Sequence, residues 1–159
     1  METIEQLRGR IPQVGKVMWI GISSSRRAEI ESVTSVTARV GTGLEGDHHA
    51  QGGNSKRQVT LIQAEHLPVV AALSGHDQVP AELLRRNIVV SGINLIALKD
   101  QQFRIGGAVL EGTAPCSPCS LMEKQLGPGG YNAMRGHGGL CAVVVEEGEI
   151  RLGDEVALL

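Results

Sequence analysis

Two cysteines lie three positions apart in the stretch "TAPCSPCS", residues 113–120. Cys116 and Cys119 each follow a proline, and Ser117 and Ser120 flank the pair Pro118 and Cys119. A pair at this spacing can hold a metal ion, form a disulfide or present a reactive sulfur. Which of the three applies depends on the element that carries the pair.

Helix signals place Cys119 near a helix start. If Ser117 is the N-cap and Pro118 takes the first helical position, Cys119 lies in the first turn. There, free N–H groups and the helix dipole favour a thiolate. If Ser120 is the cap and Glu123 closes a capping box, Cys119 lies just outside the helix but close to the same dipole. Both alternatives predict a reactive sulfur at Cys119.

Zinc binding is a competing interpretation of the same cysteines. Cys116 and Cys119 form a C-x-x-C, and His137 with Cys141 could complete a four-ligand set. Cys141, however, opens an apolar run and is more simply a small buried hydrophobic residue. A pair that is merely packed and inert is the third alternative.

The stretch "GTGLEGDHHAQGG", residues 41–53, contains G-x-G-x-x-G at Gly41, Gly43 and Gly46. A dinucleotide-binding site of that pattern needs a helix that begins inside the glycines, within a βαβ unit. The polar, Gly-rich residues that follow cannot begin a helix. We therefore reject the Rossmann interpretation.

The same stretch offers Asp47, His48 and His49 as metal ligands, an acid/base pair or part of a surface turn. We expect adjacent histidine side chains to diverge, so that at most one of them shares a site with Asp47.

Basic residues precede two of the apolar runs. Lys56 and Arg57 lie before one, and Arg85, Arg86 and Asn87 lie before another. Arginine forks suit a phosphate or a pterin-like ligand that is rich in acceptors. Solvated surface charges are the alternative.

Short β-branched runs separated by glycines indicate strands, and three stretches indicate helices. Residues 103–110 and 150–158 share a pattern that predicts a hairpin around a glycine in each. We expect a mainly β protein with short helices (α+β), a β-barrel, as a single domain over residues 1–159. The strand runs are 15–23, 32–41, 57–63, 85–92, 102–112 and 140–159; the helix stretches are 64–75, 80–86 and 117–127.

Composition excludes several classes of function. The 159 residues have a net charge of −2 and one each of Trp, Tyr and Phe, which disfavours nucleic-acid binding. The N-terminal residues carry charges and no apolar run of membrane length, so we expect neither a signal peptide nor a membrane span. We therefore expect a cytoplasmic protein, whose three cysteines stay reduced.

Five stretches, in their order and spacing, resemble a stand-alone MOSC domain. This family is named for the C-terminal domain of molybdenum-cofactor sulfurases. The resemblance runs over about 14–156 and implies a β-rich barrel and a molybdopterin-type ligand, the molybdenum cofactor. The stretches are "GLEGDHH", "RQVTL", "RRNIVVSG", "FRIGGAVLEGTAPCSPC" and "GEIRLGDEV".

The resemblance also implies roles for single residues. Cys119 matches the family cysteine that handles sulfur or ligates molybdenum, and Cys116 has a weaker claim. Arg85 and Asn87 match an Arg-x-Asn element that contacts the cofactor, with Arg86 at its variable position.

The loop "GDHH" departs from the commoner Gly-Asp-Arg-His of the family. His48 stands where arginine is usual, which removes one anion contact and leaves Asp47 and His49 as the matched residues.

The resemblance thus implies a protein in which Cys119 ligates molybdenum or carries transferable sulfur as a persulfide. Arg85, Asn87, Arg57 and His49 would hold the pterin and its phosphate. Reduction of N-hydroxylated substrates and sulfur transfer are both compatible with it. A non-catalytic cofactor carrier or adaptor, and a zinc-stabilised barrel, are the alternatives.

We expect no pyridoxal-phosphate site in this chain, because it lacks the length of a desulfurase module. Any sulfur delivered to this protein would then come from a partner; a cysteine desulfurase and a molybdoenzyme are the possible partner proteins. We expect no membrane partner and no nucleic-acid partner.

Overall fold

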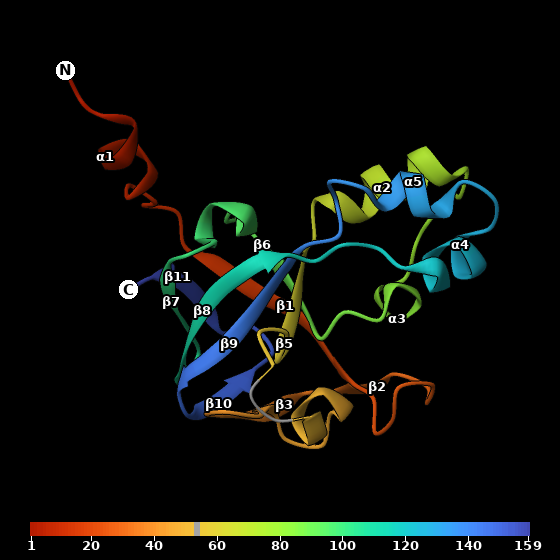
Figure 1. The fold of residues 1–159 in the computed structure, drawn as a ribbon, viewed down its shortest axis with the longest axis horizontal. Coiled ribbons are helices and arrows are strands. Elements are labelled where there is room, and N and C mark those ends of the chain that lie inside the picture. The colour runs from red at the N-terminus through yellow and green to blue at the C-terminus, as the bar shows by residue number, and fades with distance from the viewer. Residues whose placement is uncertain (53–54) are drawn as a thin grey trace.

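Seven strands close into a barrel, which confirms the expected mainly β fold with short helices (Figure 1). The computed structural model describes residues 1–52 and 55–159. The barrel closes because β1 pairs with both β6 and β11, and every pairing around it is antiparallel except that of β5 with β6. Around the barrel the strands are β1 (Gly15–Ile22), β11 (Glu155–Leu158), β7 (Gln102–Ile105), β8 (Ala108–Pro115), β9 (Leu140–Glu146), β5 (Val59–Gln63) and β6 (Ile88–Ser91).

A smaller sheet lies against one end of the barrel (Figure 1). It consists of β10 (Gly148–Arg151), β3 (Ser35–Arg39) and β4 (Gly43–Leu44). Strand β2 (Glu31–Val33) pairs antiparallel with the end of β1.

Of the two predicted hairpins, one is confirmed. β7 and β8 pair across a turn at Gly106 and Gly107, where Gly106 has a φ of 55°. The hairpin at 150–158 is wrong, since β10 pairs with β3 whereas β11 pairs with β7 and β1. The barrel closes because β11 lies between β1 and β7. The turn between β10 and β11 therefore carries the chain from the smaller sheet into the barrel.

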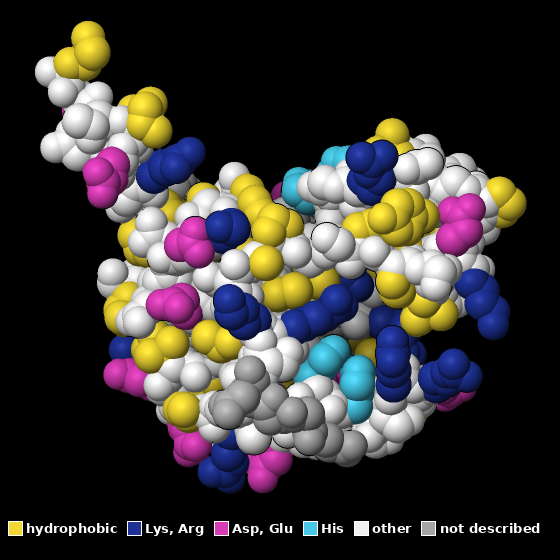
Figure 2. All heavy atoms as spheres, viewed as in Figure 1, with side chains coloured by type: hydrophobic (Ala, Val, Ile, Leu, Met, Phe, Trp, Pro, Cys, Tyr) yellow, Lys and Arg dark blue, Asp and Glu magenta, His cyan; other side chains and the backbone are white. Residues whose placement is uncertain are grey.

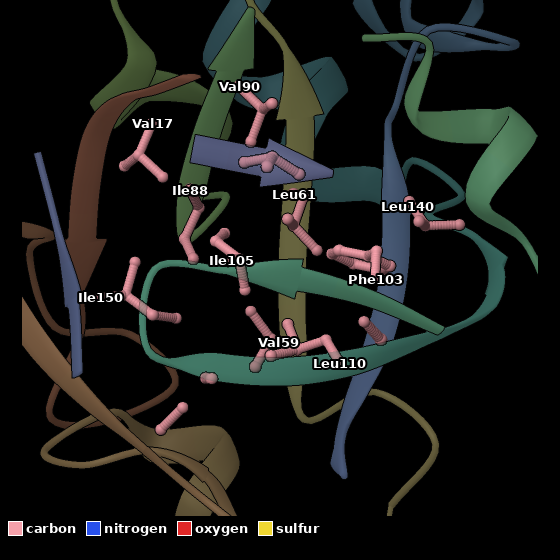
Figure 3. Close-up of a cluster of buried hydrophobic side chains, with 14 of the residues drawn as sticks. Val17, Val59, Leu61, Ile88, Val90, Phe103, Ile105, Leu110, Leu140 and Ile150 are labelled. Carbon is pink, nitrogen blue, oxygen red and sulfur yellow. The ribbon is translucent and has the colours of Figure 1, made fainter. Parts of the chain in front are cut away.

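Alternating apolar side chains fill the barrel (Figure 3). β7 shows the pattern clearly, with Phe103 and Ile105 buried and its other two residues exposed. All five residues of β5 are buried, because one face lies in the barrel and the other lies under helices. Its Ile62 belongs to a second apolar cluster, outside the barrel.

Four short helices form a layer that covers this outer cluster (Figure 1). The three predicted helices are confirmed, and the one predicted over 64–75 ends at Gly75, with a φ of 76°. The layer consists of α2 (His66–Ser74), α3 (Ala81–Leu84), α4 (Ser120–Leu126) and α5 (Gly130–Met134); elsewhere lie α1 (Ile4–Arg8) and the 3₁₀ turns η1 (His48–Gly52) and η2 (Leu95–Leu98).

Helix α1 extends from the barrel with the N-terminus, and all of its residues are exposed (Figure 1). Within the described residues, every helix is too short or too polar to cross a bilayer.

Candidate functional site

Cys116 follows β8 and is buried, with 2% of its surface exposed. Its backbone N–H donates to the Gly139 carbonyl oxygen at 2.8 Å, which extends the β8–β9 ladder. Its sulfur contacts that of Cys141, which lies on β9 and is also buried. The sequence-based interpretation of Cys141 as only a small hydrophobic residue was therefore incomplete.

The contact between the sulfurs makes the two thiols unequal. A hydrogen bond from the Cys141 thiol, together with the positive charges of Arg86, Arg57 and His49, lowers the pKa of Cys116 to about 6 against the opposing effect of burial. The pKa of Cys141 is raised, first by the same hydrogen bond and then by its own burial. Of the two thiols, Cys116 is therefore the one that ionises more readily.

These five residues, Cys116, Cys141, Arg86, Arg57 and His49, are called the Cys116 cluster below. Arg57 is exposed and His49 is half-buried, so the cluster reaches the surface on that side. Figure 2 shows Lys, Arg and His side chains gathered around a hollow between the barrel and the helical layer.

Arg86 is the buried cation of the cluster, with 3% of its surface exposed. Its Nε donates to the Gly138 carbonyl at 2.8 Å and its Nη1 to the Leu84 carbonyl at 3.0 Å. Its Nη2 has no hydrogen-bond partner among the residues that the structure describes. A Cβ at Gly138 would collide with the Cys116 carbonyl and lie 3.3 Å from that Nη2. Glycine at 138 therefore lets Arg86 and Cys116 approach each other.

Asp47 anchors the neighbouring loop from a position that is 1% exposed. Its Oδ1 accepts from the Ser23 N–H at 2.9 Å and from Asn87 Nδ2 at 3.2 Å. Its Oδ2 accepts from the His49 N–H at 3.2 Å and lies 2.8 Å from His49 Nδ1. Burial opposes ionisation, but the hydrogen bonds from His49 and Ser23 outweigh it and lower the pKa of Asp47. Asp47 is therefore a carboxylate that orients the ring of His49.

His48 and His49 stack instead of diverging, so that expectation was wrong. Their ring centroids are 4.0 Å apart and the rings are tilted by 36°. His48 Nδ1 lies 3.3 Å from the Ser23 carbonyl oxygen and 3.8 Å from the Asp47 carboxylate, whereas His49 Nδ1 lies 2.8 Å from Asp47. Ser23 and Asp47 are joined by a hydrogen bond and together hold the two rings next to each other. Burial and the neighbouring His49 lower the pKa of His48.

The glycine-rich stretch does start a helical turn, contrary to expectation. Residues His48–Gly52 form the 3₁₀ turn η1, while residues 53 and 54 lie outside the described part of the chain. The rejection of a Rossmann site is unaffected, because the strands on either side, β4 and β5, belong to different sheets.

Arg85 makes its hydrogen bonds with the loop that follows β1. It ends α3 with a φ of 56°, and its guanidinium donates to the carbonyls of Ala28 and Arg26 and to Ser23 Oγ. It therefore holds the loop that follows β1.

Asn87 has its side-chain amide fully engaged. Its Oδ1 accepts from the Thr60 N–H and hydroxyl, and its Nδ2 donates to the Gly21 carbonyl and to Asp47. Asn87 thus ties β5 and β1 to the Asp47 loop and is a positioning residue.

Cys119 is exposed and is itself the N-cap of α4, so both predicted helix starts were wrong. The predicted capping box is absent because Glu123 has other partners. Its carboxylate accepts from the N–H groups of Gly129 and Tyr131, each at 3.0 Å, and so joins α4 to α5.

The predicted zinc set does not assemble. His137 lies against Ala133 and makes an edge contact with His66, at a centroid distance of 5.3 Å. Within the described residues, the group of potential ligands that meets is Asp47, His48 and His49. Cys119 and His137 thus do not form a metal site together with Cys116 and Cys141.

The model of the MOSC domain family matches residues 46–157. The chain belongs to the MOSC domain family. The match covers the Asp47 loop, Arg86 and all three cysteines. No curated protein matches the sequence.

Solved structures share the fold of this MOSC domain. The YuaD protein from Bacillus subtilis is 19% identical, with a TM-score of 0.79 over 94% of this chain and 98% of that one. YiiM from Geobacillus stearothermophilus is 18% identical, with a TM-score of 0.73 over 91% and 75%. YiiM from Escherichia coli is also 18% identical, with a TM-score of 0.68 over 91% and 69%.

Proposed function

We propose that this MOSC domain binds the molybdenum cofactor at the Cys116 cluster and uses its cysteines toward molybdenum or sulfur. The observation that carries the proposal is the Arg86 Nη2, which is buried beside a thiolate and has no partner among the described residues. A buried donor without an acceptor costs about 1–3 kcal/mol. An acceptor-rich anion, such as a pterin phosphate, would satisfy it.

The residues present fit such a ligand. Arg86 and Arg57 would hold its anionic part through charge-assisted hydrogen bonds, and His49 would add a donor or acceptor at its Nε2. Arg85 and Asn87 would act indirectly, because their side chains hold the loops around the cluster.

Two sulfurs are available to the cofactor. The resemblance in sequence suggests the metal-ligand or carrier role for Cys119, which is exposed. Cys116 adds a thiolate that Cys141 and Arg86 stabilise before any ligand arrives. When bound, molybdenum would supply two-electron redox chemistry, such as reduction of N-hydroxylated compounds.

The other residues would prepare the site. Cys141 holds its proton between the two buried sulfurs and so keeps Cys116 ionised. Asp47 fixes the His49 ring with Nδ1 toward the carboxylate, which leaves Nε2 as the atom that would meet a ligand.

The test is the molybdenum and pterin content of protein purified from a cofactor-competent host, for wild type, Cys119→Ala and Cys116→Ala. Ser117→Ala, an exposed position between the two cysteines, is the matched control. We expect both metal and pterin in wild type and in the control, and a loss of molybdenum in the variant that removes its ligand. Equal content in all four proteins would refute a cysteine role in metal binding.

Sulfur carriage is the second form of the proposal, favoured by the exposure of Cys119. In that form a partner cysteine desulfurase loads Cys119 with a persulfide in the absence of molybdenum, and a molybdoenzyme receives the sulfur. Persulfide labelling followed by peptide mapping tests it, and a Cys119 that stays unmodified would contradict it.

A non-catalytic carrier or adaptor makes a different prediction. Pterin binding would then survive Cys119→Ala, because the arginine contacts supply the affinity. A loss greater than about tenfold, or about 1.4 kcal/mol, would instead support direct ligation by the cysteine.

A further inference from the structure

Residues 1–13, called the arm below, project from the barrel and carry α1 (Figure 1). All five residues of α1 are exposed, yet the helix has a complete capping box, in which Thr3 and Gln6 each accept from the other's backbone N–H. Arg10 donates two further hydrogen bonds to the Glu2 carboxylate, at 2.6 and 3.0 Å. A helix this short is not stable alone in water, since even Ala-rich peptides need about 12–15 residues. α1 therefore needs a surface to pack on.

One side of α1 is apolar and has no contact with the barrel. Ile4 and Leu7, three positions apart, lie on the same side of the helix and are 66% and 46% exposed. Arg8, four positions after Ile4, lies at the edge of this side. An amphipathic helix buries its apolar side against another element, so this side of the arm marks an interaction surface.

A hollow of about 630 Å³ opens at the foot of the arm. Its walls come from the arm, from the β5–α2 connection and from the β6–η2 connection. Ile11, Ile93 and Ala97 make part of its lining apolar, and Ile96 is 48% exposed beside them. Figure 2 shows the notch between the arm and the helical layer, with hydrophobic side chains at the foot of the arm. The hollow can therefore take up apolar side chains.

The arm and the hollow carry complementary charges. Within the described residues, neither Arg8 nor Glu65 forms an ion pair. The Glu65 carboxylate, at the wall of the hollow, accepts only from uncharged donors, Gln63 Nε2 at 2.8 Å and the Gly92 N–H at 2.9 Å. An arginine at the edge of an apolar helix side thus matches a carboxylate at the edge of an apolar hollow.

The composition of the arm disfavours a lipid surface as the occupant's alternative. Its side chains include two acids and two bases, so it has no net attraction to anionic headgroups. The surface that fits the arm is a protein surface with an acid beside an apolar hollow, and this chain itself supplies one.

We propose that two copies of this chain form a two-fold dimer in which α1 of each copy lies in the hollow of the other. Ile4 and Leu7 pack against the apolar lining, and Arg8 pairs with Glu65 of the other copy. A two-fold dimer needs both complementary surfaces on every copy, and each copy has one arm and one hollow.

The position of the hollow supports this exchange. Arg10 and Ile11 line the hollow, so an incoming arm also packs against the foot of the receiving arm. The two exchanged contacts therefore join into one continuous interface. None of the residues of the Cys116 cluster lines the hollow, so the proposal does not depend on cofactor binding.

The first experiment measures the oligomeric state by sedimentation equilibrium, for wild type, the double variant Ile4→Glu/Leu7→Glu and Leu152→Glu. Leu152, which is 45% exposed in the turn between β10 and β11, is the matched control. We expect a dimer for wild type and for the control, and a dissociation constant at least about tenfold higher for the double variant. Circular dichroism checks that the barrel is intact, which we expect because both arm residues are exposed.

The second experiment tests where the arm lies. In a Cys119→Ser background, Leu7→Cys and Ala97→Cys are introduced singly and together, and the proteins are oxidised and separated by non-reducing electrophoresis. We expect covalent dimers when both new cysteines are present, and none from either single variant or from the parent.

Several results would overturn the proposal. They are a monomeric wild type, an arm variant that dimerises as tightly as wild type, and a monomer that binds phosphatidylcholine and phosphatidylserine vesicles through its arm. A cross-link within one chain would place the arm on its own barrel. A covalent dimer from Leu7→Cys alone would place the two arms against each other, and either result contradicts the exchange.

Discussion

The Cys141 thiol is the largest cause of the low pKa of Cys116, so its removal should raise that pKa. With a pKa of about 6, Cys116 is about nine-tenths ionised at pH 7; at an ordinary thiol pKa of about 8.5, only a few per cent would be. Cys141→Ala deletes the hydrogen bond but leaves Arg86 and Arg57 in place. We therefore expect Cys116 in this variant to titrate with a midpoint between the pKa of about 6 and the ordinary thiol pKa of about 8.5.

The assay is the ultraviolet absorbance of the thiolate as a function of pH, in a Cys119→Ser background that leaves only the two buried thiols. The parent should show one thiolate with a midpoint near pH 6, consistent with the pKa of Cys116. Adding Cys141→Ala should move that midpoint upward by more than half a unit, which is about 0.7 kcal/mol. A parent midpoint above pH 8, or a midpoint that Cys141→Ala leaves in place, would refute the reasoning.

Three further predictions concern stability, each measured as the free energy of unfolding in urea. Asp47→Ala should lower the free energy of unfolding by on the order of 3–5 kcal/mol, because it leaves buried N–H donors without an acceptor. Asp77→Ala, at an exposed position, should change it little. Gly138→Ala should cost about 1–3 kcal/mol through its clash with the Cys116 carbonyl, whereas Gly9→Ala, with no atom closer than 3.7 Å, should cost less than about 1 kcal/mol. Stability should fall as the pH is lowered from 8 to 6, because the unfolded Cys116 thiol binds a proton more tightly than the folded one; Cys116→Ser should reduce this slope, and a slope unchanged in that variant would contradict the cause.

The strands and helices could be predicted because their signals are local. The pattern around the glycines at 103–110 predicted the β7–β8 hairpin, and Gly75 marked the end of α2. The prediction of a second hairpin was wrong because the residue pattern at 150–158 contains no information about β1 and β7, and β11 lies between these two strands. Barrel closure is a long-range constraint, and a local pattern does not carry it.

The sequence pointed to the kinds of residues that could form a site, but not to which of them come together. The sequence drew attention to Asp47, His49, Arg57 and the cysteine pair, but it favoured Cys119 as the activated thiol. The thiolate that the structure places among cations is Cys116, because Cys141, 25 positions away in the chain, comes to lie beside it.

Arg86 was named only as one of several basic residues, for a similar reason. Arg85 ends α3 with a φ of 56°, and the two neighbouring guanidinium groups bond to different parts of the chain. The local sequence does not say which of them faces the cysteines. Only the packing of Gly138 against Cys116 decides it, and this contact joins segments that are far apart in the sequence.

The central claim is that the Cys116 cluster holds the molybdenum cofactor through Arg86. The most direct measurement is the molybdenum and pterin content per chain of wild type and Arg86→Met, purified side by side from a cofactor-competent host. The account predicts both components in wild type and at least about a tenfold loss of pterin in Arg86→Met, since each buried charge-assisted hydrogen bond contributes about 1.5–3 kcal/mol. Wild-type protein without pterin, or a folded Arg86→Met protein with undiminished pterin, would contradict it.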